Sequence, residues 1–450
     1  MRINNFFKQI KRIHFIAIGG VSNSALAQLF LSKGYIVSGS DCKTNDYIEH
    51  LKSLGVDVSI GHSEENISKD IDLVIYSLAI KEDNVELKKA KQLNIPCIKR
   101  GEALAIVSKW YKNIIAVAGM HGKTTTTAMI YHIFKKAGLN PTLHIGGEID
   151  GIAKNVVIGG EEYFITEACE YGDSFLYLRP DVSVINNVEK EHLDYFKNIN
   201  NIYKSFDCFM KRSKKCFVNC SCKQRLITTP ASYIGKGSFT CAKNIKKQGE
   251  GYCFDVFIGE DFYNNFALFI AGKYNIDNAL GAIAIANYYG VDKNVIADAL
   301  KNFKGVKRRF EKVGRYNGHL VVFDYAHHPT EIKNAIQTAK SLNQGKVYVY
   351  FQPHTFSRTK SLKEMFLKSF KGADSTFICS TFNARESYDP DGDEKALATS
   401  LKNAGQKNVF YGDVKSIIED LKLKKEKGIL LFVGAGNMQN AIKTHLNELL

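Results

Sequence analysis

The sequence feature that most constrains the fold is a glycine loop within the segment AVAGMHGKTTTTAMI, residues 116–130. An apolar strand ends at Ala118, a loop follows from Gly119, and a helix begins in the run of threonines. Glycines let backbone N–H groups approach an anion, and a helix N-terminus adds partial positive charge. Lys123 can reach the β- and γ-phosphates, and the Thr124 hydroxyl can ligate Mg²⁺. Although Val117 stands where the common phosphate loop begins with glycine, the segment predicts a site for a nucleoside triphosphate.

Strand-like apolar runs alternate with helical segments along the whole chain. RIHFIAI (12–18) leads into a glycine loop, and SALAQLFLSKG (24–34) then predicts a helix that stops at Gly34. This rhythm predicts an α/β fold with parallel sheets covered by helices. Polar joints at 110–113 and 305–315 divide the chain into three blocks, near 1–110, 111–306 and 307–450. A region of shorter strands is expected at about 231–269.

Composition excludes several classes of protein. The chain has 450 residues, of which 45% are apolar and 24% charged, so it is not a disordered chain and is long enough for three domains. Ten cysteines are scattered, and Cys216-x3-Cys220-x-Cys222 lacks the spacing of a zinc knuckle, so free thiols are expected. With no signal peptide and no apolar run of roughly 20 residues, we expect a cytoplasmic protein without a membrane anchor.

The net charge needs its own explanation. Lys and Arg number 61 against 46 Asp and Glu, a net charge of +15. Such an excess fits nucleic acid, an anionic membrane surface or small polyanionic substrates. The basic residues are dispersed and no aromatic-interleaved stripe accompanies them, so we expect no nucleic-acid partner.

A second glycine loop, AIGGVSNSA (17–25), also joins a strand to a helix, and Asp41 ends the next strand about 20 residues later. Ala17 and Ser22 occupy places where a full dinucleotide-binding pattern has glycine. Three interpretations stay open for this loop: a dinucleotide site, a tight structural turn in a Rossmann-like domain, and a site for a nucleotide diphosphate group.

Polar residues gather just after several predicted strands. The carboxyl ends of parallel strands face the ligand crevice of an open sheet, so these clusters are candidates for a shared site. The adjacent side chains of His327 and His328 diverge, so one metal ion is not expected to take both. The clusters are Glu167 and Glu170; Asn186, Asn187, Glu191 and His192; Asp324, Tyr325, His327 and His328; and His354 with Arg358.

Together these motifs resemble the Mur ligases, ATP-dependent amide-forming enzymes of peptidoglycan precursor synthesis. The resemblance runs almost end to end, and the first glycine loop, DYAHHPTE (324–331) and QPHTFSRT (352–359) are similar to the alanine-adding branch. It implies three domains: a Rossmann-like N-terminal domain for a UDP-sugar, a central phosphate-loop (P-loop) ATPase domain and a Rossmann-like C-terminal domain that closes over both. The implied reaction joins L-alanine to the carboxylate of UDP-N-acetylmuramate through an acyl phosphate, in the cytoplasm, by a monomer or homodimer.

The resemblance also implies roles for individual residues, with Lys123, Glu170, His192 and His327 as the catalytic set. The ATP phosphates would be wrapped by Gly119, Met120, His121, Gly122, Lys123, Thr124 and Thr125; the rest of ATP would meet Asn275, Asn278, Arg309 and Asp324. Thr124 and Glu170 would hold one Mg²⁺, and His192 would help to hold a second. The UDP-sugar would meet Gly19, Gly20, Ser22, Ser40 and Asp41, and the amino acid Tyr325, His327 and Arg358.

Some positions depart from the family pattern. These are Ala17, Ser22, Met120, Cys169, Glu191, Tyr274, Thr355 and Asn437. Because Thr355 stands where many members carry Arg, Arg358 is left as the main anchor for the amino-acid carboxylate. The alternatives are a recycling ligase that adds a preformed peptide, an NAD-dependent oxidoreductase that uses the first loop, and a nucleic-acid-binding ATPase.

Overall fold

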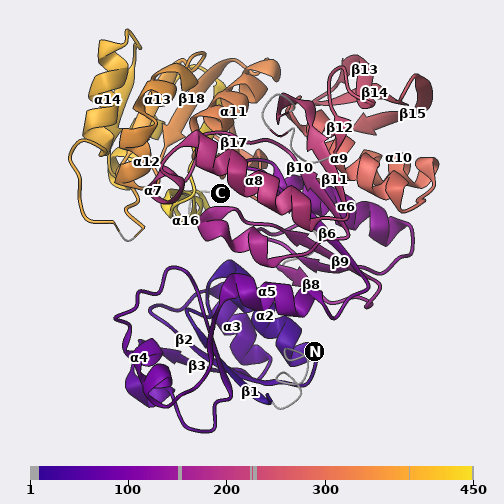
Figure 1. The fold of residues 1–450 in the computed structure, drawn as a ribbon. Coiled ribbons are helices and arrows are strands. Elements are labelled where there is room, and N and C mark those ends of the chain that lie inside the picture. Colours follow the sequence, from indigo (N-terminus) through magenta and orange to yellow (C-terminus); the bar gives the residue numbers. More distant parts are fainter. Residues whose placement is uncertain (1–9, 150–154, 223–225, 227–230, 385, 448–450) are drawn as a thin grey trace.

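Three β-sheets, each with its own helices, follow one another along the chain (Figure 1). The computed structural model describes residues 10–149, 155–222, 226, 231–384 and 386–447. In Figure 1 the first sheet forms the lower lobe, and the C-terminal sheet lies at the upper left beside the central one. The fold is therefore α/β with three successive sheet units, as the alternating sequence pattern predicts.

The first sheet has five parallel strands in the order β3-β2-β1-β4-β5. Its register sets Ile16 of β1 opposite both Ser40 of β2 and Tyr76 of β4, so the first glycine loop leaves the middle of the sheet. The strands are β1 (Arg12–Ile16), β2 (Ile36–Asp41), β3 (Asp57–Ile60), β4 (Leu73–Tyr76) and β5 (Cys97–Lys99). The helices are α2 (Val21–Ser32), α3 (Asp46–Ser53), η1 (Glu64–Asn66), α4 (Val85–Gln92) and α5 (Arg100–Ser108).

The central sheet has ten strands, in the order β15-β14-β13-β12-β11-β10-β6-β9-β7-β8. Its parallel part sets Ala118 of β6 beside Ile185 of β10, and Val117 beside Glu167 of β9. The strands of this part are β6 (Asn113–Ala118), β7 (Thr142–His144), β9 (Tyr163–Glu167), β10 (Val182–Ile185), β11 (Lys215–Asn219) and β12 (Ser232–Ile234), with β8 (Val156–Val157) antiparallel at the edge. The helices are α6 (Lys123–Lys136), η2 (Tyr171–Tyr177), α7 (Leu193–Phe196), α8 (Ile199–Arg212), η3 (Cys220–Cys222), α9 (Asn275–Tyr288) and α10 (Lys293–Lys301).

The expectation of shorter strands at about 231–269 is wrong for most of that region. The strands β13 (Thr240–Gln248), β14 (Gly251–Ile258) and β15 (Asp261–Leu268) have nine, eight and eight residues, and they pair antiparallel as two successive hairpins. One face of these hairpins packs on the core through Phe254 and Phe266, while polar side chains alternate with apolar ones. This half-exposed alternation made the strands look broken in sequence, whereas buried parallel strands read as continuous apolar runs.

The third sheet has the order β16-β17-β21-β18-β19-β20, with only the β16–β17 pair antiparallel. Asp324 and Phe351 both pair with Val433 of the central strand, so the carboxyl ends of three strands meet. The strands are β16 (Glu311–Tyr316), β17 (His319–Asp324), β18 (Lys346–Phe351), β19 (Ser375–Cys379), β20 (Val409–Gly412) and β21 (Gly428–Val433). The helices are α11 (Pro329–Ser341), α12 (Phe356–Ser361), α13 (Lys363–Ser369), α14 (Glu394–Asn403), α15 (Val414–Leu423) and α16 (Met438–Asn447).

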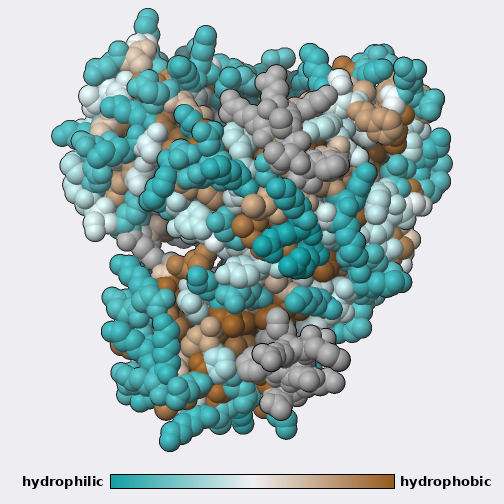
Figure 2. Space-filling model, viewed as in Figure 1, coloured by the Kyte–Doolittle hydropathy of each residue, from teal (hydrophilic) through white to brown (hydrophobic). Residues whose placement is uncertain are grey.

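The surface is largely hydrophilic and is hollowed between the lower lobe and the upper left lobe (Figure 2). Among the described residues, no helix combines the length and apolar character needed to cross a bilayer. Each of the ten cysteines lies in the described part of the chain and is a free thiol, as expected.

Candidate active site

The loop between β6 and α6 has the backbone geometry of an anion cradle. Gly119 has φ +132° and Gly122 has φ +78°, a region that glycine adopts without steric cost. A Cβ on Gly122 would lie 2.3 Å from Oδ1 of Asn278, so no larger residue fits there. The helix α6 then begins at Lys123 and directs its N-terminus toward the loop. The local geometry therefore suits a bound phosphate group.

Two asparagines that follow β10 hold this loop in place. The backbone N–H of His121 donates to Oδ1 of Asn187 at 2.8 Å, and Nδ2 of Asn187 donates to the His121 carbonyl at 3.0 Å. Asn186 donates to the hydroxyl of Thr126 at 3.0 Å. The cluster after β10 thus supports the phosphate loop through side-chain hydrogen bonds.

Glu170 lies between Lys123 and His192. Its Oε2 is 2.9 Å from Nζ of Lys123, and its Oε1 is 3.4 Å from Nε2 of His192. Burial disfavours the carboxylate, but the charges of Lys123 and His192 outweigh it and lower the pKa of Glu170 to about 2. Thr124 follows Lys123 in the first turn of α6 and is buried. A carboxylate and a threonine hydroxyl are oxygen donors of the kind that Mg²⁺ prefers, so Glu170 and Thr124 fit such an ion.

A cavity of about 610 Å³ opens between the central sheet and the C-terminal sheet, beside the phosphate loop. Its lining includes Thr125, Asn275, Asn278, Arg309 and Asp324, all predicted from the sequence to meet ATP. Nδ2 of Asn278 donates to Oδ1 of Asn275 at 2.9 Å, and Asn275 donates to the Ala271 carbonyl at 2.7 Å. The cavity is therefore large and polar enough for a nucleotide, and the structure brings these predicted residues together around it.

Asp324 has a structural role that the sequence pattern did not reveal. Its two carboxylate oxygens accept the backbone N–H groups of Ala326 at 2.7 Å and Phe310 at 2.9 Å. Burial raises the pKa of Asp324 to about 6, against the opposing charge of Arg309. The carboxylate thus holds in place the segment that connects the central unit to the third sheet, next to the cavity.

Tyr325 and His327 follow Asp324. The ring of Tyr325 lies under the guanidinium groups of Arg308 and Arg309, at 4.8 and 5.1 Å. Nδ1 of His327 is 3.1 Å from the carbonyl oxygen of Tyr325. Because a carbonyl only accepts hydrogen bonds, Nδ1 carries the proton of the neutral ring and Nε2 is unprotonated. Burial lowers the pKa of His327 to about 3, so the ring is neutral at pH 7.

Arg358 joins the C-terminal sheet to the loop after β10. Its Nε donates to Oε1 of Glu191 at 2.9 Å, and Nη1 donates to the carbonyl of His354 at 2.8 Å. Burial opposes ionisation of Glu191, but the charge of Arg358 keeps the pKa of this carboxylate well below its usual range. Glu191 and Arg358 came from separate sequence motifs, and the structure pairs them directly.

The residues predicted for a UDP-sugar lie together at the first glycine loop, but several already have protein partners. The Gly19 N–H donates to Oδ2 of Asp41 at 2.9 Å, and Gly20 precedes α2. Ser22 contacts Nε2 of His144, on the central sheet, at 2.9 Å. Ser40 is fully buried and donates to Oε2 of Glu86 at 2.6 Å. A binding role for these side chains remains a prediction.

Sequence reasoning missed several residues that complete the site. Glu189 and Glu331 line the cavity beside His121, and Arg308 is anchored by Gln439, whose Oε1 accepts from its Nε at 2.7 Å. Arg100 donates to Ser22 at 3.0 Å. Glu331 lies in the motif DYAHHPTE, three residues after His328. Glu189 follows Asn186 and Asn187 in the polar cluster after a predicted strand, and Arg308 lies in the polar segment 305–315, so position was the available signal for all three. Arg100 gave no such signal.

The phosphate loop, the polar cavity beside it and the three α/β units are features of a nucleotide-using enzyme. Models of the Mur ligase family match three consecutive regions: "Mur ligase family, catalytic domain" at 12–112, "Mur ligase middle domain" at 117–286 and "Mur ligase, glutamate ligase domain" at 308–436. The chain belongs to the Mur ligase family.

Relatives within the family are similar over nearly the whole length. UDP-N-acetylmuramate–L-alanine ligase from Caldanaerobacter subterraneus is 42% identical over 98% of both chains. The solved structure of UDP-N-acetylmuramate-alanine ligase from Thermotoga maritima has a TM-score of 0.84 at 27% identity, and the match covers 97% of this chain and 98% of that one. A murein peptide ligase from Psychrobacter arcticus shares the fold, with a TM-score of 0.72 at 24% identity over 97% and 98% of the two chains.

Proposed function

We propose that this Mur ligase joins L-alanine to the carboxylate of UDP-N-acetylmuramate, at the expense of ATP and in the cytoplasm. The observation that carries the proposal is the continuous row of Lys123, Glu170 and His192 beside the nucleotide-sized cavity, followed by the Glu191–Arg358 pair. The names of the full-length relatives support the choice of substrates.

In this proposal the three blocks 1–110, 111–306 and 307–450 bind the UDP-sugar, bind ATP and close over both. Gly119 to Thr125 hold the triphosphate through backbone N–H groups and the Lys123 ammonium. Asn275 and Asn278 approach the adenine, while Arg309 and Asp324 lie toward the phosphate and ribose.

The Mg²⁺ site would consist of Thr124 and Glu170, with His192 helping to hold a second ion, and the ions would neutralise charge on the transferring phosphoryl group. Lys123 contributes a fixed positive charge at the same place. The ammonium of Lys123 lies 2.9 Å from the Glu170 carboxylate and keeps this carboxylate ionised.

The first step transfers the γ-phosphoryl group of ATP to the muramate carboxylate, which gives an acyl phosphate and releases ADP. The neutral amine of L-alanine then attacks the acyl carbon, and the tetrahedral intermediate collapses to the amide with loss of phosphate and of one amine proton. His327 suits the positioning of that amine, because its Nδ1 faces the Tyr325 carbonyl and its neutral Nε2 can accept a hydrogen bond from the amine. Arg358 would hold the alanine carboxylate.

A substrate-omission assay tests the proposal. Phosphate release is expected only when ATP, Mg²⁺, UDP-N-acetylmuramate and L-alanine are all present. A tripeptide offered in place of L-alanine separates the alanine-adding reaction from the recycling one. A complete mixture that releases no phosphate, or a preference for the tripeptide, would overturn the assignment.

A further inference from the structure

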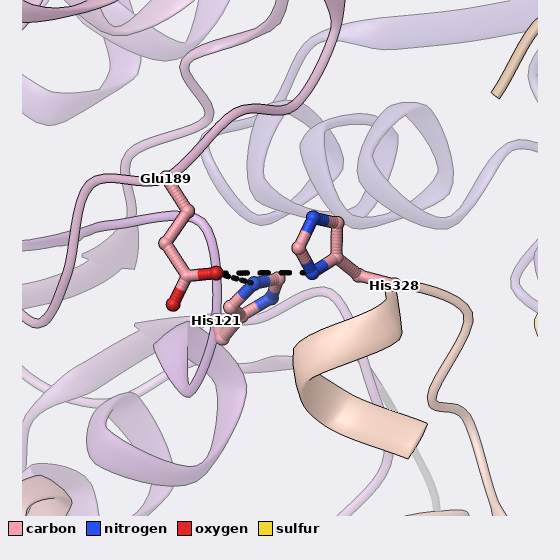
Figure 3. Close-up of side chains that lie close together, drawn as sticks. All are labelled: His121, Glu189 and His328. Carbon is pink, nitrogen blue, oxygen red and sulfur yellow. Dashed lines mark ion pairs between the residues drawn. The ribbon is translucent and has the colours of Figure 1, made fainter. Parts of the chain in front are cut away.

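A second cluster of metal-ligating side chains lies beside the phosphate loop, separate from Thr124, Glu170 and His192. His121 comes from the loop itself, Glu189 from the segment after β10, and His328 from the N-terminus of α11 in the C-terminal sheet unit (Figure 3). Oε2 of Glu189 is 3.8 Å from Nε2 of His121 and 3.9 Å from Nδ1 of His328, and the three ligand atoms lie within 4.8 Å of one another. The cluster therefore joins the phosphate loop to the third sheet.

Both imidazole rings are oriented as in metal sites, where the second ring nitrogen donates to a carboxylate or a backbone carbonyl. Nδ1 of His121 is 3.2 Å from Oε1 of Glu331. Nε2 of His328 is 3.1 Å from the carbonyl of Lys190. These outer partners leave Nε2 of His121 and Nδ1 of His328 turned toward Glu189.

The nitrogen of His121 that faces the cluster is also unsatisfied. Its Nε2 is buried and has no hydrogen-bond partner within the described part of the chain. Nδ1 of His328 receives only a long hydrogen bond of 3.3 Å, from the backbone of Thr330. A buried nitrogen without a hydrogen-bond partner is uncommon and can mark the position of a bound ion; the Glu189 carboxylate, 3.8 Å away, is too distant for a hydrogen bond.

We infer that His121, Glu189 and His328 form a binding site for a divalent transition cation of the Zn²⁺ class, which clips the C-terminal unit to the phosphate loop. Two imidazoles and one carboxylate suit Zn²⁺, whereas Mg²⁺ prefers an all-oxygen octahedron. Zn–N distances of about 2.0 Å place tetrahedral ligand atoms roughly 3.3 Å apart. Side-chain shifts of about 0.5–1.5 Å close the present separations of up to 4.8 Å to that value.

Protonation of His121 competes with binding of a metal ion to this cluster. Burial opposes the charged ring, but the carboxylates of Glu331 and Glu189 raise the pKa of His121 to about 10. Arg309 lies 3.7 Å from Glu331 and offsets part of that negative charge. Zn²⁺ therefore has to displace this proton, which makes direct measurement of metal binding the decisive experiment.

The test uses the full chain in excess Mg²⁺, with Zn²⁺ titrated against a chromophoric chelator. We expect one Mg²⁺-resistant Zn²⁺ per chain, bound at least about tenfold more weakly by Glu189→Gln and His328→Asn. Asparagine at 328 can still accept the Thr330 N–H and cap α11. The matched control is His132→Gln, a half-buried histidine on α6 outside the cluster, which is expected to bind as the wild type does.

A second measurement does not depend on the folding of any variant. X-ray absorption at the zinc edge of the wild-type protein should show two imidazole ligands together with oxygen. The proposal is overturned if no Mg²⁺-resistant Zn²⁺ binds, or if sulfur scattering shows that free cysteines hold the ion. It is also overturned if Glu170→Gln abolishes binding while His328→Asn retains it, because the ion would then occupy the Mg²⁺ site.

Discussion

Replacing Arg358 by methionine tests whether this residue binds the alanine carboxylate or only neutralises Glu191. Methionine keeps most of the apolar stem and removes the guanidinium. In the structure Nε and Nη1 of Arg358 are occupied by Glu191 and His354. Within the described part of the chain Nη2 has no protein partner, so it is the donor that would hold the alanine carboxylate.

The expected loss follows from that single contact. A hydrogen bond to a charged group contributes about 1.5–3 kcal/mol, which corresponds to about 10- to 150-fold. Phosphate release at saturating ATP and UDP-sugar should therefore show kcat/KM for L-alanine lowered by that factor in Arg358→Met. The apparent KM for ATP should stay within about twofold. Lys360→Met, which removes an exposed cation from the same helix, is the matched control and should change neither value.

A double-mutant cycle supplies the refuting result. If Arg358 acted only by neutralising Glu191, its removal would leave a buried unpaired carboxylate, which costs about 3–5 kcal/mol. Adding Glu191→Gln would then restore most of the activity, because neither charge would remain unpaired. Recovery of kcat/KM to within about threefold of the wild type would refute the anchor role; persistent loss in the double variant is the expected outcome.

Three further predictions concern the loops and the interface between the first two sheets. Ala17 has φ +64°, so Ala17→Gly should raise the free energy of unfolding by roughly 0.5–1 kcal/mol in urea denaturation, whereas Ala25→Gly in the middle of α2 should lower it. Burial lowers the pKa of His144 to about 3, so stability should fall as pH drops from 6.5 toward 3; His144→Gln should flatten this trend in thermal melts, and an unchanged slope would contradict the assignment. Lys123→Met should reduce phosphate release at least about 10³-fold while UDP-sugar binding by calorimetry is retained, and loss of both would point to misfolding instead.

Much of the fold was accessible from sequence because its signals are local. A strand, a glycine loop and the start of a helix can be recognised from about a dozen consecutive residues. The segment around Lys123 contains all three signals. The antiparallel hairpins at 240–268 were misjudged, because half-exposed strands break the apolar runs on which the prediction depended. Ser40 illustrates a second limit: its position at a strand end was evident, but its burial against Glu86 depends on a helix more than forty residues away.

The sequence by itself determined the family, the phosphate loop and the polar residues that follow each strand, since these depend on covalent order and backbone geometry. Only the tertiary structure decided which of those residues meet. Glu191 and Arg358 belong to different sheet units, as do His121 and His328, and neither pairing follows from spacing along the chain. Such contacts arise when two domains pack, and packing is fixed by the shapes and charges of whole surfaces, to which no short segment gives access.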